Sequence, residues 1–219
     1  MTDAVAGRRS IRRFLPTPVP EEIVMGILGI ASRAPSGQNM QPWFVHYVTG
    51  ATRDRLSARV TEAFARNERS IEYDYFPQNP IREPYLSRRR KVGYDLYAIY
   101  GIERDDLEGR KRAVLRNFEF FGAPIGLFFT MERDWGIGAW IDCSMFMMNV
   151  MNIARTYGLE TCAQQAWCEY SDAVRSVLEV PRNHVIISGM AVGFADHAAK
   201  ENRLITERVP PEAFVTRYT

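Results

Sequence analysis

Three short stretches of this 219-residue chain carry side chains that could bind a charged ligand. The first is RRSIRRF, residues 8–14, where four arginines surround one serine. The second is PSGQNMQPW, residues 35–43, which is rich in amide and hydroxyl groups, and the third is GLETCAQQAW, residues 158–167. Each stretch alone is typical of a solvated arm, an ordinary loop or an edge strand.

The arginine-rich stretch has the chemistry of a phosphate site. Guanidinium groups match phosphate oxygens in pairs, and a serine hydroxyl adds a further donor. Alternate residues of an extended segment share a face, so Arg8, Ser10 and Arg12 point one way and Arg9 and Arg13 the other. We therefore expect the first three side chains to hold a phosphate and Arg13 to lie in solvent.

The overall charge restricts any anion site to a local one. The formal net charge is +2, whereas nucleic-acid-binding domains usually carry a clear basic excess, so we expect no nucleic-acid partner. The longest apolar stretch, residues 139–154, contains Asp142, Asn149 and Asn152, which argues against a membrane span.

The three cysteines are an odd number and form no C-x-x-C pair, as in proteins of a reducing compartment. The N-terminal residues also lack the apolar core of a signal peptide, so we expect a cytoplasmic protein. With three scattered histidines, the cysteines are too dispersed to predict a metal site.

Common catalytic motifs are missing from the sequence. It contains no complete G-x-G-x-x-G, no Walker A loop, no H-E-x-x-H and no G-x-S-x-G. No histidine has an evident nucleophile beside it in the sequence. If the chain is an enzyme, we expect a bound cofactor to carry the chemistry.

Hydrophobic periodicity predicts alternating helices and strands around these stretches. Helices are expected at 2–9, 17–34, 51–69, 87–101, 106–122, 138–158 and 171–180, and strands at 43–50, 124–133, 159–165 and 184–194. About four strands interleaved with helices indicate an α+β or α/β sandwich in one domain, residues 1–219.

Residues 70–121 depart from this pattern. Three prolines and four aromatic residues crowd into 70–86, and two helix candidates follow. Long irregular segments between core elements are usually functional, so we interpret 70–121 as an inserted helical excursion that acts as a lid.

In combination and order, the three stretches resemble the FMN-dependent nitroreductase family. The family's opening Arg-x-Ser-x-Arg/Lys-x-Phe is matched at residues 8–14, and its Pro-Ser-x-x-Asn-x-Gln-Pro-Trp at residues 35–43. The resemblance continues through GMAVGFAD, residues 189–196, and ENRL, residues 201–204, and its details are closest to the nitroaromatic-reducing branch. It implies a three-layer α+β fold, with a mixed central sheet flanked by helices, in an intertwined homodimer.

The resemblance also implies how the residues share the cofactor. The phosphate and ribityl chain would lie on the first stretch and the tail, and the loop of the second stretch would reach the flavin of the other subunit. Gln165 and Ala166 stand where many relatives have Glu-Gly beside flavin N5, and Glu201 replaces a lysine of some relatives, for which Arg208 could compensate. The implied cofactor residues are Arg8, Arg9, Ser10, Arg12, Pro35, Ser36, Gln38, Asn39, Gln41, Gln165, Ala166, Asn202 and Arg203.

The implied activity is a ping-pong reduction of nitroaromatic compounds and quinones, with FMN bound and NADPH or NADH as donor. Aromatic residues of the excursion would roof a pocket for flat substrates. The pocket candidates are Tyr94, Tyr97, Asn117, Phe118, Phe121 and Trp135. Reductive dehalogenation or another flavin reaction is the nearest alternative, and a basic nucleic-acid-binding or regulatory module is the alternative from another class.

Overall fold

One four-stranded sheet forms the centre of the protein, in the order β1-β2-β4-β3. Its strands are β1 (Phe44–Thr49), β2 (Ile125–Glu132), β3 (Glu160–Gln164) and β4 (His184–Gly193) in the computed structural model, which describes residues 2–77 and 79–219. All neighbouring pairs of these strands are antiparallel, so the expected mixed sheet is wrong for the described residues. Long helical connections allow either strand direction, and interleaving alone therefore did not determine it.

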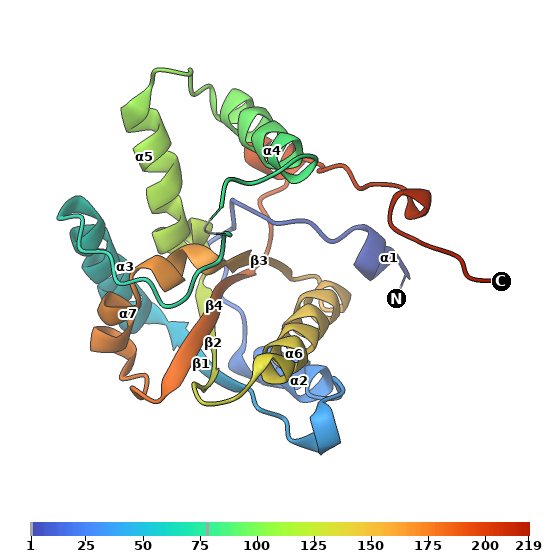
Figure 1. The fold of residues 1–219 in the computed structure, drawn as a ribbon. Coiled ribbons are helices and arrows are strands. Elements are labelled where there is room, and N and C mark those ends of the chain that lie inside the picture. The colour runs from blue at the N-terminus through green and yellow to red at the C-terminus, as the bar shows by residue number, and fades with distance from the viewer. Residues whose placement is uncertain (1, 78) are drawn as a thin grey trace.

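Helices cover both faces of the sheet and give three layers (Figure 1). On one face lie α2 (Glu21–Ala31) and α6 (Ile137–Thr156), which pack together over the sheet. On the other face lie α3 (Gly50–Ala65), α7 (Ser171–Leu178) and the 3₁₀ segment η2 (Arg116–Gly122). The three-layer α+β architecture expected from the sequence is confirmed.

The central strands are buried on both faces, which explains their nearly continuous apolar sequences. In β2, Ile125, Leu127 and Phe129 face the α2 and α6 layer, whereas Phe128 faces the opposite layer. Every residue of β4 is buried. The edge of β3 that does not pair with β4 contacts the N-terminal arm, because the Ile11 N–H donates to the Thr161 carbonyl.

The remaining helical segments lie around this sandwich, and Trp167 of one of them is fully buried in its core. They are α1 (Thr2–Ala6), α4 (Tyr85–Tyr100), α5 (Leu107–Leu115) and the short 3₁₀ segments η1 (Gly37–Asn39), η3 (Gln165–Glu169), η4 (Lys200–Arg203) and η5 (Pro211–Ala213). In Figure 1, α4 and α5 project from the body, and the C-terminal tail runs away from it. The two ends of the segment 70–121, near residues 70–73 and 116–122, pack into the core.

By length and composition, α6 is apolar enough to cross a membrane. Its Ala139, Cys143 and Phe146 are buried within the α2 and α6 layer. The helix thus acts as a core helix here.

Candidate functional site

Arg8, Ser10 and Arg12, here called the arginine cluster, gather around one buried thiol. Burial raises the pKa of Cys162 on β3, while Arg12, a hydrogen bond from Ser10, and Arg8 act in the opposite direction. All three alternate residues therefore lie near the same strand, as expected for one face of an extended segment. Arg13 lies on the other side, with its side chain 52% exposed.

Backbone contacts hold this arm against the edge of the sheet. The Ile11 N–H donates to the Thr161 carbonyl at 3.1 Å, and Ile11 is buried. The Arg12 N–H donates to Asn202 Oδ1 at 2.8 Å. The arm is thus fixed between β3 and η4. Within the arm, the Arg12 guanidinium donates to the Ser10 carbonyl at 3.3 Å.

Asn202 has a different role from the expected one. Its amide nitrogen donates to the carbonyls of Arg13 at 2.7 Å and Asp196 at 2.9 Å, and its oxygen already accepts from Arg12. Both donors of the buried amide are occupied, so Asn202 positions the arm and does not face a phosphate. Arg203 beside it is exposed.

The negative charge of Glu201 is balanced by arginines that do not belong to the arginine cluster. Its carboxylate accepts from Arg116 at 2.7 Å and lies 3.9 Å from Arg13. Burial alone would raise the pKa of Glu201, but these arginine partners hold it below its usual value. Arg116 also donates to the Arg12 carbonyl at 2.9 Å. The suggested compensation by Arg208 is not supported, since its guanidinium bonds within its own segment.

The cluster has the charge balance of an anion site. Arg8, Arg9 and Arg12 are all half-buried, yet none forms an ion pair with a carboxylate of the described residues. Half-buried guanidinium groups normally find an anionic partner. A phosphate-bearing ligand fits this arrangement of forked donors and one hydroxyl.

A pocket opens next to the cluster along β3. It consists of two adjoining cavities, of about 470 and 610 Å³, which share Tyr73, Asp74, Tyr75, Ala163 and Gln165. Since a strand rises about 3.3 Å per residue, the cluster near Cys162 and the pocket lie within roughly 10 Å along the chain. Ala166 and Asn117 line the first cavity. The second is lined by Trp140 and methionines of α6.

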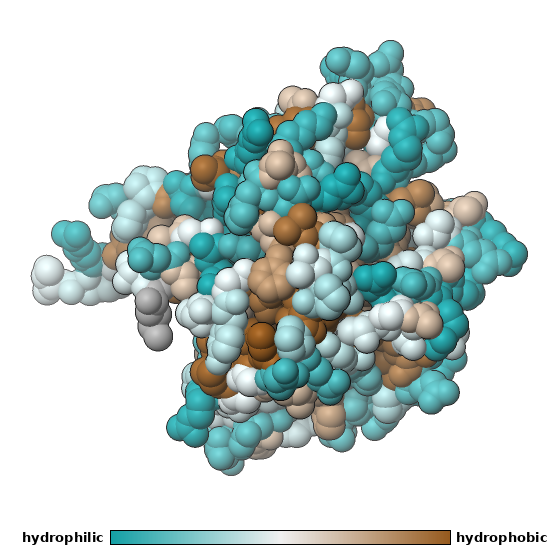
Figure 2. Space-filling model, turned by 180° about the vertical axis from the view of Figure 1, so that it is seen from behind, coloured by the Kyte–Doolittle hydropathy of each residue, from teal (hydrophilic) through white to brown (hydrophobic). Residues whose placement is uncertain are grey.

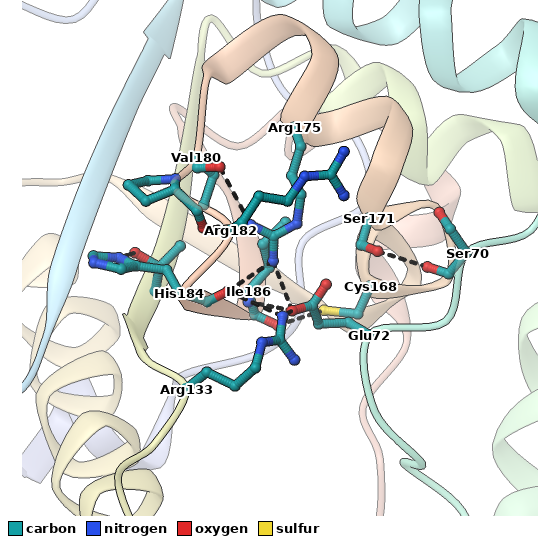
Figure 3. A network of polar contacts seen from close by, with 12 residues as sticks. Ser70, Glu72, Arg133, Cys168, Ser171, Arg175, Val180, Arg182, His184 and Ile186 are labelled. Carbon is teal, nitrogen blue, oxygen red and sulfur yellow. Dashed lines mark hydrogen bonds and ion pairs between the residues drawn. The ribbon is translucent and has the colours of Figure 1, made fainter.

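Buried hydrogen bonds fix the wall of this pocket. Ser70 and Glu72 run beside residues 168–170, and their N–H groups donate to Glu169 at 2.9 Å and Cys168 at 2.8 Å. The Glu72 carboxylate accepts from Arg175 at 2.7 Å and also from Arg133, as Figure 3 shows. Arg175 in turn donates to the Pro181 and His184 carbonyls, both at 2.8 Å.

Tyr73 follows this anchor and reaches over the sheet. Its hydroxyl donates to the Ile187 carbonyl at 2.6 Å. Its ring contacts the Trp140 ring edge-on, with the two ring centroids 4.9 Å apart. Burial raises the pKa of Tyr73, so the hydroxyl remains a donor. Tyr73 is a rigid part of the wall that joins the two cavities.

The loop at 35–41 is held in an unusual conformation on the outer surface. Gln38, Asn39 and Gln41 have positive φ angles of 48°, 63° and 51°. The Gly37 N–H donates to Asp142 of α6 at 3.0 Å, and the Gln41 N–H donates to Ser36 at 3.0 Å. Strain of this kind commonly marks binding segments.

The same loop lies outside the pocket of its own chain. Pro35, Gln38, Asn39 and Gln41 are exposed, and Ser36 is half-buried. None of these residues lines either cavity. Behind the loop Pro42 is buried, and the rings of Trp43 and Phe146 stack with their centroids 4.8 Å apart, so both residues support the loop.

Several predicted pocket residues lie elsewhere. Phe118 and Phe121 are 1% and 2% exposed in the core, so their assignment to the pocket is wrong. Tyr94 and Tyr97 line a separate hollow on α4. Trp135 packs on the α2 and α6 layer and donates to Glu132 at 2.9 Å.

Of that predicted set, Asn117 does line the pocket, and its carbonyl accepts from Gln164 at 2.6 Å. The aromatic wall instead comes from Tyr73, Tyr75 and Phe76, which the sequence pattern singled out without a role. Ser70 and Glu72 pair with residues 168–170 and so bring these aromatic residues to the pocket. The prolines that follow interrupt any regular pattern, so the sequence did not predict this pairing. Across the described residues, no group of three or more histidine, cysteine or acidic side chains could hold a metal.

The fold and these contacts together define an α+β protein in which half-buried arginines lie near an aromatic pocket. The model of the Nitroreductase family matches residues 5–194. The chloronitrobenzene nitroreductase of Comamonas testosteroni is 38% identical, over 98% of this chain and 95% of its own. The nitrobenzene nitroreductase of Ectopseudomonas oleovorans is 37% identical over the same shares.

Solved structures agree with these matches. The crystal structure of the FMN and NADPH-dependent nitroreductase NfnB from sphigopyxis sp. strain HMH superposes with a TM-score of 0.96. It is 36% identical and covers 100% of this chain and 98% of that one. The chain therefore belongs to the nitroreductase family, as its sequence motifs indicated.

Proposed function

We propose that this chain is an FMN-dependent oxidoreductase that uses NADPH or NADH to reduce nitroaromatic compounds, and also quinones, in a ping-pong reaction. The observation that carries the proposal is the arginine cluster beside an aromatic pocket, since its half-buried cations pair with no carboxylate in residues 2–77 and 79–219. The names of the relatives, which include nitrobenzene and chloronitrobenzene nitroreductases, support the substrate class.

The residues present fit a bound FMN. Arg8, Ser10 and Arg12 would hold its phosphate, with Arg9 and Arg203 adding charge nearby. Gln165 and Ala166, in the first turn after β3, would present backbone groups to the edge of the ring system. Bound FMN would supply the two-electron chemistry between the nicotinamide and the second substrate.

The chain's own contribution to this reaction is orientation and exclusion of water. Tyr73 and Trp140, locked edge-on, form a rigid apolar wall, and Tyr75 and Phe76 supply further flat surface. Such a wall favours flat aromatic substrates. No side chain of the pocket is required as an acid or base, because protons can come from water.

We also propose that the active form is a homodimer in the cytoplasm. The strained loop at 35–41 faces away from its own pocket, which suits a contact with the cofactor of a second copy. Ile137, Ile141 and Met148 of α6 are 78%, 57% and 44% exposed. Figure 2 shows apolar side chains gathered in the middle of one largely hydrophilic face. Three free cysteines fit a reducing compartment.

Spectroscopy and turnover test the proposal. Purified protein should be yellow and should release FMN on denaturation, and nitrobenzene should be reduced with NADPH or NADH as donor. Initial rates should give parallel double-reciprocal lines, as a ping-pong order requires. Protein that stays colourless with added FMN would overturn the flavin assignment, whereas dehalogenation of a halophenol without nitro reduction would overturn the substrate class.

Light scattering after gel filtration tests the dimer. The unsubstituted protein should have twice the 25.1 kDa mass of one chain. Replacing Ile141 by Asp should shift it toward the monomer and release FMN, since a charge would be buried in the interface. A monomer that retains FMN fully would contradict the proposed sharing of the site.

A further inference from the structure

A further hollow, called here the Phe76 hollow, adjoins the pocket where the chain enters α4. Its volume is about 470 Å³, within the range of roughly 300–1,000 Å³ that is typical of small-molecule sites. Phe76 lines both this hollow and the first cavity of the pocket, so the two spaces meet at its ring. Pro77, Pro80 and Ile81 form part of the apolar wall.

The Phe76 hollow combines flat rings with two cations. Phe76 and Tyr85 both line it, and both are exposed although they are large aromatic residues. The Arg89 guanidinium lies over the Phe76 ring, with its Cζ 4.5 Å from the ring centroid, and this cation–π contact holds the cation at the hollow. Arg82 is the second cation of the lining. Exposed apolar groups gathered at one place are typical of a binding surface.

No neighbouring carboxylate neutralises these two arginines. Neither Arg82 nor Arg89 forms an ion pair with an acid of residues 2–77 and 79–219. Glu83, the acid next to Arg82 in sequence, accepts from the N–H and the hydroxyl of Ser87 at the start of α4 and does not line the hollow. The lining therefore carries a net positive charge, and it suits an anion that also has a flat ring.

We propose that the Phe76 hollow binds the adenosine 2′-phosphate end of NADPH, with Arg82 and Arg89 at the phosphate. The inference rests on the proposed function, in which the nicotinamide must enter the pocket beside the flavin ring. The adenosine half of the dinucleotide then lies outside that pocket, and the hollow that shares Phe76 with it is the adjoining space. Guanidinium groups match phosphate oxygens in pairs, and the exposed Tyr85 ring offers a stacking surface for adenine. Because NADH lacks this phosphate, the chain should prefer NADPH as its donor.

Binding of two adenosine nucleotides tests the site without turnover. Adenosine 2′,5′-bisphosphate carries the 2′-phosphate and adenosine 5′-monophosphate lacks it, and calorimetry measures the affinity of the FMN-loaded protein for each. The bisphosphate should bind roughly tenfold to a hundredfold more tightly, as expected for hydrogen bonds between charged groups. Replacing both Arg82 and Arg89 by Ala should abolish this preference and leave the affinity for the monophosphate unchanged.

Stopped-flow reduction of the bound flavin measures the same preference with the complete donors. In the double variant, the NADPH concentration that half-saturates flavin reduction should rise by the same factor as the loss of bisphosphate affinity. The limiting rate of reduction and the response to NADH should not change, because the substituted side chains contact only the 2′-phosphate. Arg112→Ala is the matched control, since this arginine is 71% exposed on α5 and should leave both preferences intact.

Equal affinity of the unsubstituted protein for the two nucleotides would overturn the inference. A preference for the bisphosphate that survives in the double variant, or equal use of NADH and NADPH by the unsubstituted protein, would overturn it as well. Protein that binds no FMN, or whose FMN is reduced by neither donor, would overturn the proposed function on which the inference rests.

Discussion

The carboxylate of Glu72 and the guanidinium of Arg175 form a 2.7 Å ion pair with side chains only 2% and 7% exposed. The pair joins the start of the excursion to α7, and the same carboxylate accepts from the Ile186 N–H at 3.3 Å. Residues far apart in sequence are thereby locked together just behind the pocket wall. The pocket owes its shape to this buried pair.

Removing one member of the pair should be costly. Glu72→Ala leaves Arg175 buried without compensation, and we expect the free energy of unfolding to fall by about 3–5 kcal/mol. Urea unfolding of the apoprotein measures the loss. The exposed pair of Arg69 and Glu169 is the control, since Glu169→Ala should cost only about 0–1 kcal/mol. Similar losses for both variants would contradict the assigned role.

Acid should weaken the fold through protonation of His46, which lies beside the buried Thr130. Thr130, fully buried, lies 3.2 Å from both His46 Nε2 and His184 Nδ1. Burial, followed by His184 and Arg175, lowers the pKa of His46 below 6.5. As pH falls below about 6.5, His46 therefore binds a proton more readily in the unfolded chain than in the folded one. The free energy of unfolding should decrease over this range.

Urea unfolding at several pH values between 5 and 8 measures this dependence. His46→Gln should flatten it, because an amide does not titrate. Replacing the exposed His197 should leave the pH dependence of the free energy of unfolding unchanged. An equally steep profile in His46→Gln would show that other groups cause the acid sensitivity.

The two neighbouring arginines of the N-terminal arm should differ in cofactor binding. Arg12→Ala removes a cation of the arginine cluster, and FMN affinity should fall roughly tenfold to a hundredfold. Arg13→Ala removes a half-exposed side chain whose Nε lies 3.9 Å from Glu201 Oε1. The FMN affinity should therefore change by less than about threefold. Fluorescence titration compares them, and equal effects would refute the division of the arm into two faces.

Gly189 in β4 should not tolerate a side chain. A Cβ at this position would collide with the ring of Trp167, which is fully buried. We expect Gly189→Ala to destabilise the fold by about 1–3 kcal/mol. Gly29→Ala is the control, since nothing lies within 4 Å of the added atom and alanine favours the helix. Thermal unfolding should give a lower midpoint for Gly189→Ala than for Gly29→Ala. An unchanged midpoint for Gly189→Ala would contradict close packing of Trp167 against β4.

The cysteines should be inert in the folded protein. Burial raises the pKa of Cys143 and of Cys168 to about 12, and it also raises that of Cys162. Thiolates are the reactive form, so a thiol reagent at pH 8 should label none of the three before denaturant is added. Labelling of the native protein, located by mass spectrometry, would identify a thiol that is less protected than the structure indicates.

Much of the fold followed from local patterns. The apolar runs at 124–133 and 184–194 predicted β2 and β4 because both strands are buried on two faces. Strand direction could not follow, because the connections are long enough for either. The aromatic residues of 116–122 were misassigned to the pocket, since sequence does not distinguish a lid aromatic from one in the core.

The sequence by itself determined the arginine arm, the amide-rich loop and the family, because spacing along an extended segment is enough to place Arg8, Ser10 and Arg12 on one face. Only the tertiary structure decided which groups surround them. Asn202 holds the N-terminal arm by hydrogen bonds, and Glu201 pairs with Arg116. The buried ion pair of Glu72 with Arg175 positions Tyr73 at the pocket. These contacts join residues 85 to 190 positions apart, and packing of the whole chain, which no local pattern encodes, brings them together.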